Sequence, residues 1–356
     1  MGGPEPFVGR DRVIDNLSHA IIGSAVVALA PPPVSPAVVA AVLIAAEAPD
    51  FDFVIRMAGG PVTYLKHHRG PSHGLITLPL QAAAIAGLLA AVSPAPGFWP
   101  LFCWALAGGL SHVLFDFLND YGTQGFWPFS RRWIALDLIP IIDFWMLGTI
   151  VAGWVVHWAW PGHRQAIFAA VWLLLLAYVG LRFLLRRRAW RLVADRFDME
   201  GACGEAVPCG PGWKAERLTI HPALLSLRAW RYVAQREGEY LTGMVWVRPG
   251  TVSDPERAEN HHDRVVLASL KAQTVSTFAD WARRPRATVE RRESLYLVRW
   301  SEMRYEVDGH SPFTAYAWLD DELKLVDEGL GPQRPENIDK DAVKRRLQKE
   351  MGRAKP

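Results

Sequence analysis

Histidine, arginine and serine side chains crowd into one short stretch of the sequence, KHHRGPSHG, which runs from Lys66 to Gly74. His67, His68 and His73 all fall within it, and a long apolar run follows directly. Imidazoles bind metal ions and transfer protons, and a guanidinium holds phosphate or carboxylate groups. The stretch therefore predicts a site of metal binding or catalysis next to an apolar helix.

Imidazole and carboxylate groups also lie at the ends of other apolar segments, at His19, Asp50, Asp52, His112, Asp116, Asp120, Asp137 and Asp143. His112 and Asp116 are four positions apart, so a helix places both side chains on one face. Taken singly, each group has a structural explanation, because helix caps and interfacial loops use the same residue types. Together they indicate a site, since an ionisable group about 6 residues inside a helix end lies roughly 9 Å deep and needs a partner or a function.

The donor types favour a divalent transition-metal ion. The predicted ligands are His19, Asp50, Asp52, His67, His68, His73, His112 and Asp116. Imidazole and carboxylate donors without neighbouring thiolates fit zinc best, and manganese or iron next, and they argue against a thiolate site or a calcium cage. The set exceeds the four ligands of a tetrahedral ion, so one or two ions are predicted. A catalytic ion would lower the pKa of bound water to about 7 and supply hydroxide as the nucleophile.

Three residues are predicted to take part in catalysis. Arg69 could hold a phosphate or stabilise transition-state charge, because a guanidinium stays charged and has no lone pair for a metal. His68 is either a further ligand or the proton donor to the leaving group. Asp120 is counted with these two as a catalytic residue.

Charge divides the chain into two parts. Residues 1–188 carry 12 Lys/Arg and 10 Asp/Glu, whereas residues 189–356 carry 27 and 26. The net charge of +3 gives no reason to expect a nucleic-acid partner. The sparse charge of the first part indicates a lipid environment, and the dense charge of the second predicts a soluble domain.

The first part predicts a multi-pass helical bundle in the membrane. Four apolar runs approach the roughly 20 residues that cross hydrocarbon: Ser72–Val92, Phe98–Leu118, Leu138–Trp160 and Gln165–Leu185. Two shorter runs, Leu17–Ala30 and Val34–Ala48, reach only about 21 Å, so they either span a thinned region or form a re-entrant pair. In the first of the four long runs, Ser72 is expected to cap a helix that begins at His73.

Basic residues are expected to lie on one side of this membrane. If the segments pair as hairpins with a cytoplasmic amino terminus, the cytoplasmic pieces hold ten Lys/Arg and the opposite loops hold only Arg164. This asymmetry follows the positive-inside rule and predicts an inner-membrane, multi-pass protein with both termini in the cytoplasm. All the candidate site residues then fall at cytoplasmic ends of segments.

The second part, residues 189–356, predicts a β-rich α+β domain with its core over about residues 200–330, followed by a charged helical tail. YLTGMVWVR (240–248), ESLYLVRW (293–300) and FTAYAWLDDELKLV (313–326) are rich in aromatic and β-branched residues, which is typical of strands, and LDDE predicts a hairpin turn. His261, His262 and Asp263 are expected in a surface loop. The predicted fold class is therefore mainly α: a polytopic membrane helical bundle of four long and two short helices, with a C-terminal β-rich α+β soluble domain.

Residues 15–185 resemble a known family. The motifs PDFDF, HRGPSHG and GLSHVLFDFLNDYGTQGFWPF, in this order after a histidine in the first segment, are similar to those of the YdjM/YbcI-like inner-membrane proteins, described as membrane-bound metal-dependent hydrolases and as LexA-binding. The positions that match the family pattern are His19, Asp50, Asp52, His68, Arg69, Gly70, Ser72, His73, His112 and Asp116. The resemblance implies a metal-dependent hydrolase without naming its substrate, and these residues give no indication of LexA binding. The pattern is more loosely similar to that of zinc phospholipase C enzymes, which use a His-x3-Asp helix in an all-helical fold.

Three functions are compatible with the sequence. The first is a hydrolase in which metal-activated water attacks an ester or phosphoester, with membrane lipid as the partner and a lipid or lipid-linked substrate suggested by the depth of the site. The second is a non-enzymatic membrane anchor with a structural metal site, which uses the same residue types. The third is a transporter or metal carrier, which would place its ionisable groups near the membrane midplane and not at one edge.

Overall fold

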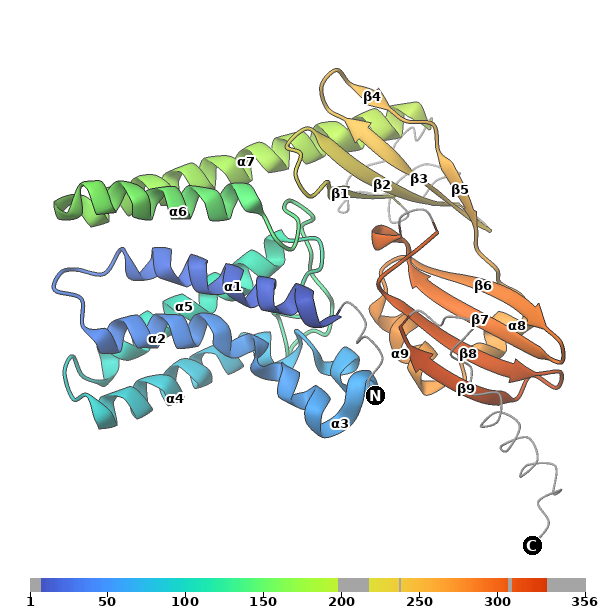
Figure 1. The fold of residues 1–356 in the computed structure, drawn as a ribbon, viewed down its shortest axis with the longest axis horizontal. Coiled ribbons are helices and arrows are strands. Elements are labelled where there is room, and N and C mark those ends of the chain that lie inside the picture. Colours follow the sequence, from blue (N-terminus) through green and yellow to red (C-terminus); the bar gives the residue numbers. More distant parts are fainter. Residues whose placement is uncertain (1–7, 198–217, 237, 307–308, 332–356) are drawn as a thin grey trace, which may run out of the picture.

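The computed structural model describes residues 8–197, 218–236, 238–306 and 309–331 (Figure 1). The first part of the chain forms a helical bundle. The second part forms two antiparallel sheets, and two helices lie beside the second of these sheets (Figure 1). This arrangement confirms the predicted fold class, although the helix Phe53–His67 was not among the predicted helices. Cys203, Cys209 and the predicted charged tail lie outside the described residues.

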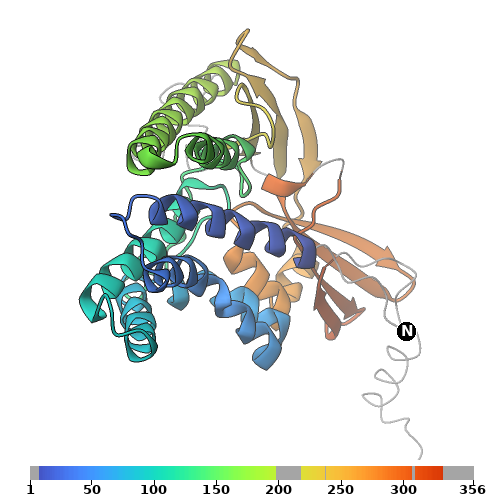
Figure 2. The same cartoon turned by 60° about the vertical axis from the view of Figure 1, so that its left-hand side comes forward.

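The bundle contains helices α1 (Val8–Val27), α2 (Pro36–Glu47), α3 (Phe53–His67), α4 (Thr77–Val92), α5 (Phe98–Leu118), α6 (Phe144–Ala159) and α7 (Arg164–Arg196). Short 3₁₀ turns η1 (Ala48–Asp52) and η2 (Pro71–His73) connect α2 to α3 and α3 to α4, and η3 (Pro161–His163) precedes α7. Helix α5 lies centrally and contacts α1, α2 and α4. Helices α6 and α7 run beside each other, as the two green helices of Figure 2 show.

Small residues let the helices around α5 approach closely. A Cβ atom added at Gly108 of α5 would lie only 2.4 Å from the carbonyl oxygen of Val42 in α2. The layer shared by α2, α4 and α5 is rich in alanine: Ala37, Ala41, Ala45, Ala82, Ala86 and Ala105. Helices in lipid associate through such small residues, because lipid offers no hydrophobic driving force between apolar faces.

Two helices of the described residues are long and apolar enough to cross a membrane, Phe98–Leu118 and Pro161–Arg196. Shorter apolar helices cover Asn16–Val27, Thr77–Val92 and Phe144–Ala159. Large apolar side chains point outward from the bundle: Leu88, Trp158 and Leu173 are 72%, 86% and 67% exposed. Exposed apolar side chains of this kind are suited to lipid contact.

Helix α4 begins at Thr77, so the prediction that a helix begins at His73 is wrong. Ser72 does not cap this helix. Its hydroxyl lies 3.2 Å from Asp52 Oδ2 and 2.9 Å from His73 Nδ1, and these two contacts hold the chain in the η2 turn. The polar residues of the site are therefore presented by a loop, and the apolar helix that follows is shorter than the predicted span.

Helix α6 begins at Phe144, so the predicted segment Leu138–Trp160 is helical only in its later part. Asp143 caps this helix by accepting hydrogen bonds from the backbone N–H groups of Trp145 and Met146, and its other oxygen accepts one from Tyr178 of α7. Between α5 and α6 the chain forms a long loop, residues 119–143. Helix α7, in contrast, extends beyond the predicted span and reaches the C-terminal domain.

The C-terminal domain has α8 (Arg264–Ser269) and α9 (Gln273–Trp281) beside two sheets. One sheet contains β1 (Leu218–Pro222), β2 (Ala229–Arg236), β3 (Glu239–Trp246), β4 (Thr251–Val252) and β5 (Glu256–Glu259), and the other contains β6 (Pro285–Arg292), β7 (Leu295–Glu302), β8 (Thr314–Asp320) and β9 (Leu325–Leu330). The predicted strands correspond to β3, β7, β8 and β9, and the predicted turn joins the antiparallel pair β8–β9. Strands β2 and β6 were not predicted, because arginines interrupt their apolar pattern.

The domain and the bundle are joined by a buried carboxylate in the loop 119–143. Asp137 is 0% exposed and accepts hydrogen bonds from Arg283 at 2.8 and 3.0 Å, while Arg186 of α7 lies 3.4 Å away. Burial alone would raise the pKa of Asp137, but the two guanidinium groups outweigh burial and hold this pKa below its ordinary value. Because Arg283 follows α9, this carboxylate ties the C-terminal domain to the bundle.

Asp137→Asn should destabilise the protein by about 3 kcal/mol at pH 7, because breaking a buried ion pair leaves uncompensated charge. Asparagine tolerates the left-handed backbone of this position, where φ is 51°, so the variant tests the charge alone. A depressed folded pKa contributes stability above the unfolded pKa, and this contribution is lost as the pH falls through the folded value. Thermal unfolding in detergent should therefore show a difference between wild type and variant that shrinks below about pH 4.

Asp254→Asn is the matched control. Asp254 is 94% exposed where it meets Arg196 at 3.2 Å, and exposed pairs contribute little. Its variant should unfold like the wild type. Equal stability of Asp137→Asn and wild type at pH 7 would show that Asp137 does not tie the two parts together.

Candidate metal centre

Candidate residues from separate elements converge at the end of the bundle next to the C-terminal domain. His19 lies on α1, Asp50 and Asp52 on η1, His73 on η2, and His112 and Asp116 on α5. Their exposed fractions are all between 0% and 8%. So many buried ionisable groups in one place require compensating charge or a bound ion.

His73, His112 and Asp116 form the middle of this group. The Nε2 atoms of His73 and His112 lie 3.1 Å apart. Asp116 Oδ2 lies 3.1 Å from the first of these nitrogens and 3.4 Å from the second. The four-residue spacing on α5 places His112 and Asp116 on one face as predicted, and the η2 turn brings His73 to them.

Hydrogen bonds on the far side of each ring indicate which nitrogen carries the proton. His112 Nδ1 lies 2.6 Å from the carbonyl oxygen of Ala46, which can only accept, so Nδ1–H donates. The Ser72 hydroxyl donates to Asp52 and so accepts from Nδ1–H of His73. In the neutral rings, the two Nε2 atoms therefore carry the lone pairs.

The middle of this group brings hydrogen-bond acceptors together. The two Nε2 lone pairs are directed at each other and at the Asp116 carboxylate. The buried oxygens Asp50 Oδ1 and Asp116 Oδ2 make no hydrogen bond of normal geometry with the described residues. Buried acceptors that face one another need an added proton or a cation. The donor set fits a metal ion, because metal-binding imidazoles typically donate their other N–H to a carbonyl or another polar group, as both rings do here.

His19 and Asp50 extend the group beside His112. The rings of His19 and His112 stack with their centroids 3.7 Å apart. Asp50 Oδ1 lies 3.5 Å from His73 Nε2 and 3.6 Å from His112 Nε2. Two triads, His19–Asp50–His112 and His73–His112–Asp116, each keep their ligand atoms within 4.8 Å of one another. Because they share His112, the two triads are parts of one site.

Asp52 lies one step away and organises the neighbouring groups. Both its oxygens lie 3.1 Å from Nδ1 of His68, and the Tyr64 hydroxyl lies 2.7 Å from the same nitrogen. Asp52 Oδ2 also accepts from the backbone N–H of Arg69 at 2.9 Å and from Ser72. Burial alone would raise the pKa of Asp52, but the contacts with His68 and with the Arg69 N–H hold this pKa below its ordinary value. This carboxylate thus links His68 to the two-triad site.

The Arg69 side chain is 2% exposed and lies beside Asp116. Its Nη1 atom is 2.9 Å from Asp116 Oδ1 and 3.4 Å from the carbonyl oxygen of Gly122. Its guanidinium lies over the Tyr121 ring, 4.7 Å from the centroid. A guanidinium cannot bind a metal, so Arg69 neutralises a carboxylate whose other oxygen faces the two imidazoles. A role of Arg69 in binding substrate stays a prediction.

His67 and Asp120 lie apart from the two triads. His67 ends α3 and belongs to neither triad among the described residues. Asp120 Oδ2 lies 3.7 Å from Nδ1 of His221 in β1, and the Asp120 backbone oxygen accepts from Arg304. The predicted roles of His67 as a ligand and of Asp120 in catalysis stay predictions.

Several groups that contact the site were not predicted from the sequence. Asn119 Nδ2 donates to Asp116 Oδ1 at 3.1 Å, Tyr64 contacts His68, and the Ala46 carbonyl orients His112. Asn119 directly precedes Asp120 in the motif GLSHVLFDFLNDYGTQGFWPF. This position within the motif is the one sequence signal for Asn119. A backbone carbonyl such as that of Ala46 has no side-chain signature.

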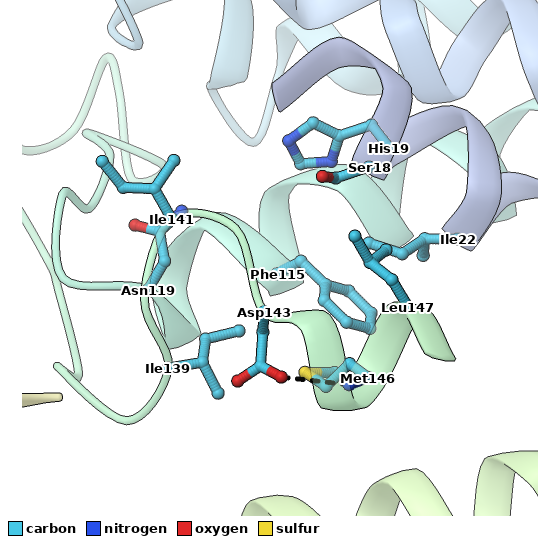
Figure 3. A pocket seen from close by; sticks show the side chains of 10 residues that line it. All are labelled: Ser18, His19, Ile22, Phe115, Asn119, Ile139, Ile141, Asp143, Met146 and Leu147. Carbon is cyan, nitrogen blue, oxygen red and sulfur yellow. Dashed lines mark hydrogen bonds between the residues drawn. The ribbon is translucent and has the colours of Figure 1, made fainter. Parts of the chain in front are cut away.

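A pocket lies beside His19, between α1, α5 and α6 (Figure 3). The cavity is small, with room for about one water molecule. Its polar walls come from Ser18, His19, Asn119 and Asp143, and the apolar walls include Ile22, Phe115 and Met146. The pocket therefore connects a candidate ligand to an apolar space.

Comparisons with known proteins match two parts of the chain separately. Residues 14–189 match the family model described as YdjM inner membrane protein, and residues 264–342 match the YfhP C-terminal alpha/beta plait domain. A curated relative, "Uncharacterized protein YfhP" of Bacillus subtilis (strain 168), is 25% identical over 321 residues, which are 88% of this chain and 93% of the relative. No solved structure matches the chain significantly. The first match includes every candidate ligand, and it confirms the resemblance indicated by the motifs.

The purified wild-type protein should carry one or two equivalents of a transition metal, measured by elemental analysis in detergent. Replacing both His112 and Asp116 with alanine should remove most of it, because losing two facing ligands destroys the geometry. His261→Ala is the control, since His261 is 37% exposed in a loop of the C-terminal domain and should not affect metal content. A folded wild-type protein free of metal would contradict the metal centre.

Proposed function

We propose that this chain, whose residues 14–189 match the YdjM inner membrane protein family, is a membrane-bound metal-dependent hydrolase that cleaves an ester or a phosphoester. The proposal is carried by one observation: the Nε2 atoms of His73 and His112 face each other and the Asp116 carboxylate at 3.1 to 3.4 Å. Buried acceptors in this arrangement suit a cation, and the adjacent Asp52–His68 pair suits proton transfer. Hydrolysis of an ester or a phosphoester uses both.

Zinc suits the donors best, with manganese or iron as alternatives. His73, His112 and Asp116 would hold the ion, and His19 and Asp50 would complete its ligand set or hold a second ion. When bound, the ion supplies Lewis acidity and activates water for attack at neutral pH. Arg69 balances the charge of Asp116, so the carboxylate can remain ionised in a buried site.

His68 is the proposed proton-transfer group. Asp52 accepts from Nδ1–H of His68, which leaves the Nε2 lone pair to take a proton from water and return it to the leaving group. Burial lowers the pKa of His68, so the ring is neutral near pH 7 and able to accept a proton. His68 is also 16% exposed, in contrast to the fully buried His73 and His112, which gives it access to a reactant.

The surroundings of the bundle support an amphiphilic substrate. Exposed apolar side chains around the bundle support placement in lipid. We therefore favour a lipid or lipid-linked ester or phosphoester as the substrate.

A membrane anchor with a structural metal is the second candidate. It is favoured by the burial of the candidate ligands, because structural metal sites are closed whereas catalytic sites keep a position open for water or substrate. Turnover distinguishes the two functions, since both require metal.

Zinc-loaded protein should hydrolyse members of a panel of ester and phosphoester substrates, and those with alkyl chains faster than short ones. His68→Gln should lower kcat by about 100-fold or more, the usual contribution of general acid–base catalysis, and should keep its metal. His261→Gln is the control and should retain full activity. Metal binding without turnover on any substrate would favour the structural anchor, and loss of metal in His68→Gln would make His68 a ligand.

We also propose that the site lies on the cytoplasmic side of the inner membrane, as the distribution of basic residues indicates. The test uses protein in which Cys103, Cys203 and Cys209 are replaced by serine. Ser130 and Ala95 are exposed in the loops that follow and precede α5, at opposite ends of that helix. In intact cells, an impermeant thiol reagent should label Ala95→Cys and spare Ser130→Cys. The reverse pattern would invert the topology.

A further inference from the structure

Two side chains of the C-terminal domain bind the backbone next to the metal centre. Arg304 lies on η5 (Met303–Tyr305), the turn that follows β7, and is 2% exposed. Its Nη1 atom donates to the backbone oxygen of Asp120, and the Tyr305 hydroxyl donates to the same oxygen at 3.1 Å. Both side chains thus donate to the same backbone carbonyl, that of Asp120 in the loop that follows α5.

Arg304 is held rigidly from its own side. Its Nε atom lies 3.1 Å from Glu302 Oε1, and Glu302 is 0% exposed. Glu302 also accepts from the backbone N–H groups of Arg284 and Arg304, each at 3.1 Å. Burial alone would raise the pKa of Glu302, but the Arg304 guanidinium and these N–H groups hold it below its ordinary value. A buried pair with several hydrogen bonds fixes geometry, because either charge alone would be costly there.

Hydrogen bonds continue from Asp120 to a candidate ligand. Asn119 Oδ1 accepts from the backbone N–H groups of Tyr121 and Gly122 at 3.0 and 2.8 Å, and its Nδ2 donates to Asp116 Oδ1 at 3.1 Å. The Gly122 carbonyl accepts from Arg69 Nη1, the atom that pairs with the same Asp116 oxygen. The backbone of residues 119–122 therefore fixes Asn119 and Arg69, which are two of the partners of Asp116 Oδ1.

Aromatic packing provides a second connection. The Tyr121 ring lies under the Arg69 guanidinium. The same Tyr121 ring also packs against Trp281 and Phe313 of the C-terminal domain, whose ring centroids lie 5.6 and 6.1 Å from the Tyr121 centroid. The position of Arg69 thus depends on the C-terminal domain through a side chain as well as through the backbone.

We propose that Arg304 and Tyr305 are positioning residues for the metal centre, and that the C-terminal domain completes the site from outside the membrane. They hold residues 119–122, which place Asn119 and Arg69 on one oxygen of Asp116 and leave the other oxygen facing His73 and His112. Displacing this loop changes the orientation of a ligand without removing any ligand. The proposal rests on the metal centre but not on the hydrolase activity.

The test compares full-length wild type, Arg304→Met and Tyr305→Phe in detergent. Binding of Zn²⁺ should be about 10- to 100-fold weaker in Arg304→Met, the usual effect of losing an outer contact of a metal ligand, and weakened less in Tyr305→Phe. The absorption spectrum of bound Co²⁺ should change, because it reports ligand geometry. Amide exchange at Tyr121 and Gly122 should become faster, because their partner Asn119 is no longer held.

Arg286→Met is the matched control. Arg286 pairs with Glu306 at 2.7 Å and bonds the backbone oxygen of Glu259, so its loss disturbs the C-terminal domain without touching residues 119–122. It should lower the melting temperature and leave Zn²⁺ affinity, the Co²⁺ spectrum and loop exchange unchanged. If Arg304→Met behaves like this control, the proposal is wrong. If the wild type binds no metal, the metal centre fails, and unchanged exchange at Tyr121 and Gly122 would overturn the positioning of the loop as well.

Discussion

The structure depends on a group of buried hydrogen-bond acceptors that face one another at one end of an apolar bundle. His73, His112 and Asp116 approach to 3.1–3.4 Å with their acceptor atoms inward, and Asp50 lies next to them. Such a group is stable only with added positive charge. Arg69 supplies part of that charge from one side of Asp116, and the proposed metal ion supplies it on the other. The need to bring these groups together explains why residues 68–76 and 119–143 are largely loops within an otherwise helical part of the chain.

The buried polar groups around His73, His112 and Asp116 form a polar layer, which lies between two environments. On one side, helices packed through alanine and glycine present large apolar side chains outward, which suits lipid. On the other side, the C-terminal domain supplies hydrogen-bond donors to the loop after α5, as Arg304 and Tyr305 do to the Asp120 carbonyl. Arg182 illustrates the boundary: it is 1% exposed within the apolar helix α7, bonds the Leu138 carbonyl at 2.8 Å, and lies over the Trp230 ring of β2. The domain therefore makes a polar layer at the bundle end physically acceptable.

Much of the site could be predicted because its groups follow helix geometry or are unusual in apolar surroundings. The spacing of His112 and Asp116 fixed their common face, and His19 and His73 stood out as ionisable groups beside apolar runs. The prediction that a helix begins at His73 was wrong, because Ser72 donates a hydrogen bond to Asp52, which lies far away in the sequence. Local capping rules carry no information about such a partner. For the same reason Asn119, Tyr64 and the Ala46 carbonyl were not predicted. The residue type does not reveal that the Asn119 and Tyr64 side chains point toward the site, and the Ala46 contact is made by a backbone atom.

The sequence by itself determined the two-part organisation, the apolar helices, four of the strands and the residue types of the candidate metal centre, because composition and periodicity are local properties that burial in lipid or in a sheet imposes directly. Only the tertiary structure decided which candidates meet. It brought His19, Asp50, His73, His112 and Asp116 into two triads that share His112, left His67 and Asp120 outside them, and turned Arg69 onto Asp116. It also placed Arg304 and Tyr305, nearly two hundred residues away, on the loop beside the site. These outcomes depend on how loops turn and how two domains dock, and many separate contacts fix them jointly.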